Sequence, residues 1–216
     1  MSASEKQIVY DFIHGSDYAF TSIYNAYVDV LLSYGTGLGF EREVLKDAIQ
    51  DVFMKLYINR RQLADVQNLK FYLFRSLKNR LLDIQKSLVE LNDIADYESN
   101  FSVKTTILDE MIEGEDKIAI QQKIDRLLSA LTARQREAIY LRFLHEMEYD
   151  EIAQLLDMTP QACRKLVFRG IKRIRNENIG LFLIIVLLYT LDSPAHRIYR
   201  PATARSSHAS FQGDRQ

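Results

Sequence analysis

Cysteine, proline and glycine are scarce in this chain of 216 residues. It has one cysteine, Cys163, with three prolines and eight glycines. A single thiol excludes an intrachain disulfide and a cysteine-based zinc cluster, and it fits a reducing compartment. Proline and glycine, which favour turns, are therefore few, and apolar residues recur every three or four positions along most of the chain. The sequence therefore predicts an all-α protein.

The chain also has no excess of positive or of negative charge. The chain has 28 Lys and Arg against 29 Asp and Glu, which leaves a formal net charge of −1. Any surface for nucleic acid must then be a local patch. The N-terminal stretch has neither the basic nor the apolar part of a secretory signal, so we expect a cytoplasmic protein. The four histidines stand far apart without metal-ligand spacing, so no metal site is expected. We expect no other cofactor.

Two blocks of helices are expected, joined by an acidic linker. In the first block the apolar periodicity predicts helices over about 17–32, 41–59 and 68–87. The glycine-rich stretch 35–39 is expected to end the first of them. From 88 to 115 the periodicity weakens and eight acidic residues face one base, which indicates a poorly packed linker. The pattern then returns in four segments. The predicted units are 1–87, the linker 88–115, a second helical domain 116–178, and an apolar segment with a tail at 179–216.

The four segments of the second block are predicted at about 116–130, 133–144, 149–156 and 160–176. The last two have the lengths and the spacing of a helix-turn-helix. Thr159 is a suitable N-cap for the final helix, and Pro160 suits its first position. We therefore expect the residues 157–159 to form the turn.

The final helix has one apolar side, which includes Cys163, and one basic side. Between positions 159 and 175 there are six bases and no acid. Lys and Arg neutralise phosphates, and Arg can bind guanine with two hydrogen bonds, so this side suits DNA. A solvated surface helix is the plainer alternative. Phe168 argues against that alternative, because a phenyl ring among bases is unfavourable in water yet can pack on a thymine methyl group.

Both blocks resemble the extracytoplasmic-function (ECF) sigma factors of the sigma-70 family. The stretches LTARQREA at 131–138, YDEIAQLL at 149–156 and CRKLVFRG at 163–170 resemble region 4 of that family. DAIQDVFMKLY at 47–57 and FYLFR at 71–75, followed by Asn79 and Asp83, resemble region 2. Together the motifs cover about 17–175 in the family's order, and the acidic linker lies where the family has a variable connection.

The chain departs from the family pattern at a few positions. Asp157 replaces the usual glycine of the turn, and Cys163 replaces a β-branched residue. Asp can adopt a left-handed backbone, and Cys packs as a small apolar side chain, so both fit the fold. Tyr57 stands where Trp is frequent, and Lys86 stands near a frequent Arg.

The resemblance implies a binding protein rather than an enzyme. It would bind core RNA polymerase and direct it to promoters, and it would have no small-molecule substrate. Its implied partners are promoter DNA, the clamp helices of the largest polymerase subunit, the flap of the second subunit and an anti-sigma factor. Region 4 would read the upstream −35 element, and region 2 would recognise and melt the −10 element.

The resemblance also implies three sets of contact residues. The set that binds core polymerase is Asp47, Gln50 and Asp51. The set for the −10 element and melting is Asp65, Gln67, Asn68, Arg75, Lys78, Asn79 and Arg80. The set for the −35 element is Arg134, Gln161, Arg164, Lys165, Phe168 and Arg169. Without the resemblance, the first set is an ordinary solvated helix face, and Asn79 is a buried amide that braces its helix.

Two other functions stay open on the residues alone. A helix-turn-helix regulator would bind DNA without being a polymerase subunit. A helical adaptor would use the uncharged segment 179–191 to bind a protein or a membrane surface. As a helix this segment spans about 20 Å, which is short of a bilayer core of about 30 Å. We expect it to pack on the helical domain or on a partner, and we expect disorder from 192 to 216.

Overall fold

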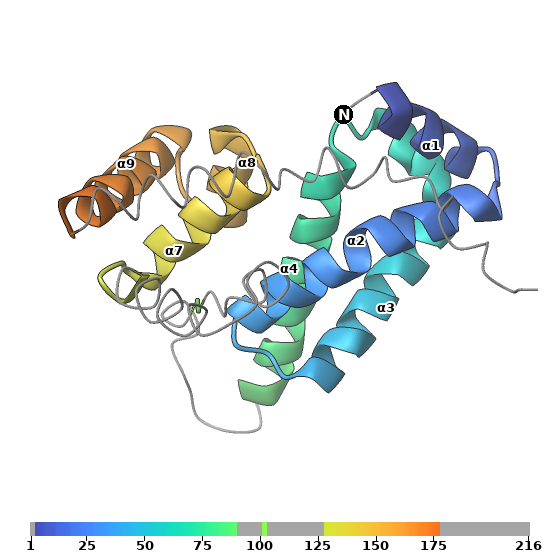
Figure 1. Cartoon of the computed structure of the whole chain (residues 1–216). Helices are drawn as coiled ribbons and strands as arrows, with labels where there is room; N and C mark the ends of the chain where they lie inside the picture. Colours follow the sequence, from blue (N-terminus) through green and yellow to red (C-terminus); the bar gives the residue numbers. More distant parts are fainter. Residues whose placement is uncertain (1–2, 90–100, 103–127, 178–216) are drawn as a thin grey trace, which may run out of the picture.

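The structure is a computed structural model, and it describes residues 3–89, 101–102 and 128–177. These ranges contain helices and no strand, so the all-α prediction is confirmed. The helices form two groups (Figure 1). We call α1 to α4 the N-terminal unit and α7 to α9 the C-terminal unit.

The N-terminal unit holds α1 (Ala3–Ile13), α2 (Asp17–Gly37), α3 (Arg42–Ile58), the 3-10 turn η1 (Arg60–Asp65) and α4 (Leu69–Val89). The three predicted helices are therefore present as α2, α3 and α4. Helix α1 was not predicted; it packs on α2 and on η1.

Glycines near the end of α2 do not stop the helix where the sequence suggested. The helix continues through Gly35 to Gly37, and a Cβ on Gly35 would overlap Leu45 Cδ2 of α3. The missing side chain lets α3 approach α2, and that packing outweighs the low helix propensity of glycine. The turn to α3 follows at Gly39, whose φ is 91°.

The C-terminal unit holds α7 (Ala133–Ile139), α8 (Tyr149–Leu155) and α9 (Pro160–Glu177). A π-helical turn, η3 (Tyr140–Leu144), prolongs α7. The helices predicted at 133–144, 149–156 and 160–176 are thus confirmed. Most of the segment predicted at 116–130 lies outside the described residues, as do 179–191 and the tail 192–216.

The two units pack against each other and share one hydrophobic core. Phe101, from the stretch predicted to be a linker, is 3% exposed and lies between Tyr34 of α2 and Tyr140 of η3. Its carbonyl accepts a hydrogen bond of 2.7 Å from Arg136 Nε, and the next amide, Ser102 N–H, donates to the carbonyl of Gly37 at 2.7 Å. The prediction of poor packing is therefore wrong for Phe101.

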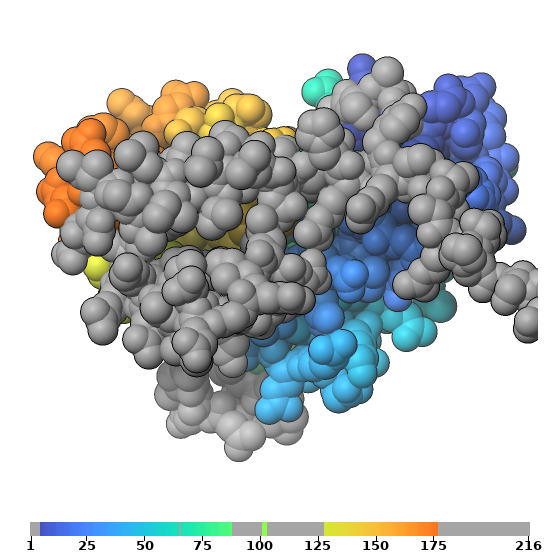
Figure 2. Space-filling model, in the orientation of Figure 1, coloured from blue at the N-terminus to red at the C-terminus, as the bar shows by residue number. Residues whose placement is uncertain are grey.

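The limits of the predicted domains remain a prediction, although α4 reaches Val89, just past the expected boundary at 87. In the space-filling view, side chains of α9 form one end of the molecule and those of α1 form the opposite end (Figure 2). Across residues 3–89, 101–102 and 128–177, no helix has both the length and the apolar character needed to cross a bilayer.

Candidate nucleic-acid interface

Helices α8 and α9 form the expected helix-turn-helix. Asp157 in the turn has a φ of 50°, so it adopts the left-handed backbone for which glycine is usual. Thr159 caps α9, because its Oγ1 accepts a hydrogen bond of 3.2 Å from the amide of Ala162. Pro160 is the first residue of α9.

Helix α9 separates an apolar side from a basic side. Cys163, Val167 and Ile174 are buried, and burial raises the pKa of the Cys163 thiol. The other side exposes the predicted contact residues Gln161, Arg164, Lys165, Phe168 and Arg169. Phe168 is 66% exposed, which is unusual for a ring that only supports a fold.

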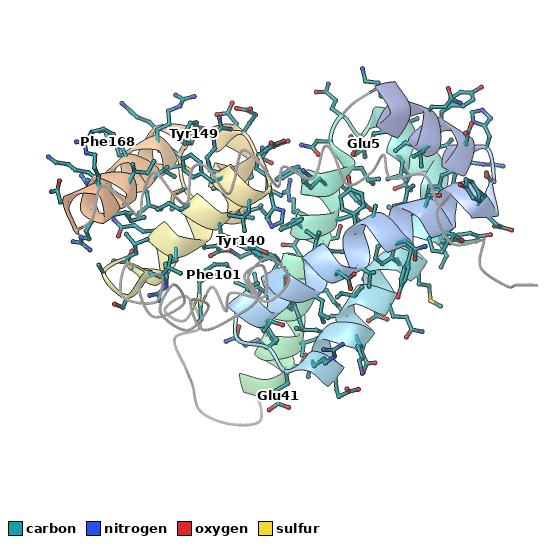
Figure 3. The ribbon with its side chains drawn as sticks, viewed as in Figure 1. Glu5, Glu41, Phe101, Tyr140, Tyr149 and Phe168 are labelled. Carbon is teal, nitrogen blue, oxygen red and sulfur yellow. The ribbon has the colours of Figure 1, made fainter. Side chains whose placement is uncertain are left out.

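Arg164 lies between α9 and α8. Its guanidinium carbon is 5.7 Å from the ring centre of Tyr149, and its Nη2 is 3.8 Å from Asp150 Oδ1. Both charged side chains are largely exposed, so this ion pair is weak and can give way to a DNA contact. Tyr149 and Phe168 both project from the outer side of the C-terminal unit (Figure 3).

Arg134, the remaining residue of the −35 set, stands on α7 and is half-buried. Helix α7 packs along α9, and Gly170 allows this approach, because a Cβ there would lie 2.7 Å from Ile139 Cδ1.

The predicted polymerase-binding residues lie on α3. Asp47 and Gln50 are exposed, whereas Asp51 is half-buried. Asp51 Oδ2 accepts hydrogen bonds from both Nε and Nη2 of Arg80 on α4, at 2.8 and 2.7 Å. Two residues assigned to different partners therefore bind each other.

Gln50 also lines an apolar groove of about 770 Å³ between α2 and α3. Aromatic and aliphatic side chains form its floor, with Arg42 and Lys46 on the α3 side; its other lining residues are Phe20, Tyr24, Val28, Asp29, Leu32, Ile49, Phe53, Met54 and Tyr57. The groove thus borders the predicted polymerase-binding residues.

The residues predicted for the −10 element follow η1 and continue along α4. Gln67 and Asn79 are exposed, so the alternative role of Asn79 as a buried brace is wrong. Asp65 ends η1. Asn68 lies just before α4 and caps it, since its Oδ1 accepts a hydrogen bond of 3.2 Å from Phe71 N–H. The set does not share one face of α4, because Arg80 binds Asp51 of α3.

Three members of that set contact the C-terminal unit. Asn68 Nδ2 donates to Glu151 Oε1 at 2.6 Å, and Arg75 Nη1 donates to Gln154 Oε1 at 3.1 Å, both on α8. Lys78 Nζ binds Glu137 Oε1 of α7 at 2.9 Å. No pattern in the sequence pointed to these contacts.

Comparison with known proteins shows which families and proteins this chain resembles. The family Sigma-70, region 4 matches residues 121–174, which include the helix-turn-helix. The ECF RNA polymerase sigma factor SigM of Bacillus subtilis (strain 168) is 21% identical over 162 residues, which cover 71% of this chain and 91% of SigM. These similarities support an ECF sigma factor of the sigma-70 family.

A solved structure has the same fold. The sigma factor RpoE, in complex with the anti-sigma factor NepR from Bartonella quintana, superposes with a TM-score of 0.52 and 19% sequence identity. The match covers 73% of this chain and 94% of that chain. Together the comparisons support a role with RNA polymerase in transcription initiation.

The sequence did not point to several residues where the two units meet. Tyr34 donates its hydroxyl to Glu137 Oε1 at 2.7 Å, and burial followed by the Glu137 charge raises its pKa well above the ordinary value. His145 is also buried there. Tyr34, Glu137 and His145 fit the apolar and polar pattern of their own segments. Nothing in the sequence therefore distinguished them from other core or surface positions. In the described part of the chain, no group of His, Cys, Asp and Glu is placed to hold a metal ion.

Proposed function

We propose that this chain is a sigma factor that reads the −35 promoter element with α9, and recognises and melts the −10 element with residues of η1, the loop after it and α4. The observation that carries this proposal is the exposed basic side of α9, which is the second helix of the helix-turn-helix and is capped at its start by Thr159. That side has several bases and no acid, so it is built for a polyanion.

On α9, different side chains suit different parts of DNA. Arg164 lies near the N-terminal end, where a recognition helix meets base edges, and it can bind a guanine with two hydrogen bonds. Lys165 and Arg169 suit phosphates, and Arg134 suits a phosphate beside α7. Exposed Phe168 suits a thymine methyl group or a sugar.

In the N-terminal unit, the exposed amides of Gln67 and Asn79 suit base edges that become accessible when strands separate. Arg75, Lys78 and Arg80 supply positive charge for the adjacent phosphates. Binding an unstacked base would offset part of the stacking energy that is lost on melting.

Helix α3 supplies the surface for core polymerase. Exposed Asp47 and Gln50 can bind basic and polar side chains of the clamp helices, and the apolar groove beside Gln50 adds area that a partner helix can bury. The flap of the second subunit would hold the C-terminal unit. An anti-sigma factor is a further proposed partner, because RpoE, which has the same fold, is bound to NepR.

Transcription assays with purified core polymerase test this function. Wild-type protein should start transcripts from members of a promoter library, and Asp47→Arg should lose most of this activity because it reverses a charge on the polymerase-binding side. Asp11→Arg on α1 is the matched control and should stay active, since the Asp11 carboxylate accepts a hydrogen bond from Gln7 of its own helix and belongs to none of the proposed contact sets. DNA binding without polymerase-dependent initiation would instead indicate a helix-turn-helix regulator.

A further inference from the structure

The ring of Tyr149, the first residue of α8, contacts two arginine side chains. The guanidinium carbon of Arg142 lies 4.8 Å from the ring centre, and that of Arg164 lies 5.7 Å from it. Both distances are within the roughly 6 Å at which a cation and an aromatic ring attract each other. The ring therefore joins Arg142 of η3 to Arg164 of α9, although neither Tyr149 nor Arg142 belongs to a predicted contact set.

Arg142 is held in place by the loop before α8. Its Nη1 donates a hydrogen bond of 2.7 Å to the carbonyl oxygen of Met147 and lies 3.3 Å from Glu148 Oε2. Met147 is 1% exposed, and its N–H donates to the carbonyl oxygen of Leu141 at 3.1 Å. Arg142, and the Tyr149 ring beside it, are thus attached to a well-packed loop.

Arg164 lies in a more open place than Arg142. Its side chain is 60% exposed, and the Asp150 carboxylate, 3.8 Å away, belongs to a side chain that is 70% exposed. Such an ion pair is too weak to hold a long side chain in one conformation. The Tyr149 ring is half-buried and packs on the hydrophobic core, so it is the more rigid of these two neighbours of Arg164.

The two contacts of Arg164 differ in what they leave free for DNA. The Asp150 pair uses N–H groups that a base edge also needs, so it must break when Arg164 binds a guanine. An aromatic ring attracts the guanidinium through the ring face and occupies none of its hydrogen-bond donors. The contact with Tyr149 can therefore persist in the DNA complex, and it reduces the side-chain entropy that Arg164 loses on binding.

We propose that Tyr149 is a positioning residue for Arg164: its ring, held by Arg142, sets the direction of the guanidinium, so that Arg164 discriminates between the bases of the −35 element. This inference rests on the proposed function, because it requires that Arg164 reads a base. Tyr149 acts through Arg164 and not by reading a base itself. It thereby determines specificity from the first helix of the helix-turn-helix.

The experiment measures the base preference at each position of the −35 element. The full chain, assembled with core RNA polymerase, selects from a library of double-stranded DNA fragments of random sequence, and sequencing of the bound fragments gives the preferences. Arg164→Ala identifies the base position that depends on Arg164. Tyr149→Leu removes the ring, whereas Tyr149→Phe keeps it. Tyr18→Leu on α2 is the matched control, because Tyr18 is 84% exposed and belongs to no proposed contact set.

Tyr149→Leu should reduce the preference at the Arg164 position by about two- to fivefold, the ratio that corresponds to one exposed cation–π contact. Preferences at the other positions should stay the same, and Tyr149→Phe and Tyr18→Leu should keep the wild-type preference. In the Arg164→Ala background, Tyr149→Leu should cause no further change at that position. An equal loss of affinity for all sequences, with the preference at the Arg164 position intact, would indicate a merely structural role and overturn the proposal.

A fluorinated ring keeps the test decisive even if Tyr149→Leu does not fold. Phenylalanine with three fluorine atoms on its ring fills nearly the space of Tyr149, but the fluorine atoms withdraw electrons and weaken the attraction of the ring for a cation. With this residue at position 149, the preference at the Arg164 position should be lower than in Tyr149→Phe. Equal preferences would overturn the proposal.

The same selection separates a failure of this proposal from a failure of the proposed function. If the wild type selects promoter sequences but Arg164→Ala leaves every base preference intact, Arg164 reads no base; the role of Tyr149 is then refuted, and the proposed function stands. If the wild-type protein with core polymerase selects no sequence, both are refuted.

Discussion

Protonation of His145 should destabilise the protein in mild acid. The His145 side chain lies where α4 meets the C-terminal unit, with its ring 4.8 Å from Phe74 and 4.7 Å from Tyr140. It is 8% exposed, and within the described residues its Nε2 has no hydrogen-bond partner. Burial first, and the charge of Lys70 second, lower the pKa of His145 to about 3.

The direction of the pH effect follows from this lowered pKa. In the unfolded chain the imidazole titrates at its ordinary pKa of about 6.5, so the unfolded state takes up the proton first. The contribution of neutral His145 to the free energy of unfolding is fully present above about pH 6.5, and it is lost as the pH falls from about 6.5 toward 3. Proton uptake by the unfolded state reduces the free energy of unfolding by about 1 kcal/mol at pH 5.5 and by about 3 kcal/mol at pH 4.5.

Urea unfolding, followed by circular dichroism at pH 7.5, 5.5 and 4.5, measures this loss. His145→Asn removes the titrating group, and the carboxylates stay the same in both proteins. The free energy of unfolding of the wild type should therefore fall more than that of the variant, by about 1 kcal/mol between pH 7.5 and 5.5. Parallel pH profiles for the two proteins would refute the reasoning, whatever the variant's stability at neutral pH.

Two further substitutions probe α9 directly. Arg164→Ala should weaken binding to a −35 element by about 1–3 kcal/mol and relax the preference at one base pair, while Lys165→Ala should weaken binding to all sequences alike. Binding titrations with single-base variants of the element distinguish the two results. A uniform loss of affinity with Arg164→Ala would contradict base reading. Gly170→Val should lower the free energy of unfolding by about 1–3 kcal/mol, because its side chain meets Ile139. In the same urea titration, the free energy of unfolding of Gly170→Ala should stay within about 1 kcal/mol of the wild-type value, since the better helix propensity of alanine offsets the closer contact. A Gly170→Val variant as stable as wild type would show that α7 can shift to accommodate the larger side chain.

The sequence determined the helices and the basic side of α9. Apolar spacing predicted α3, α4, α8 and α9 nearly to their observed ends, and the start of α2, because each amphipathic helix must bury one stripe. The cap at Thr159 and the inward position of Cys163 were also predictable, since both depend on neighbours a few residues away. The same spacing at Val9 and Phe12 could have revealed α1, since both are buried.

Only the tertiary structure decided how polar residues of distant helices meet. Lys78 and Glu137 each stand on an amphipathic helix, where the pattern describes them as solvated charges, yet they form a largely shielded pair between the two units. Glycines at 35 and 37 were expected to end a helix, but α3 and Phe101 pack on them, and burial outweighs local propensity. Contacts across many residues of sequence depend on which helix faces cover each other, and that choice is made by packing the whole core.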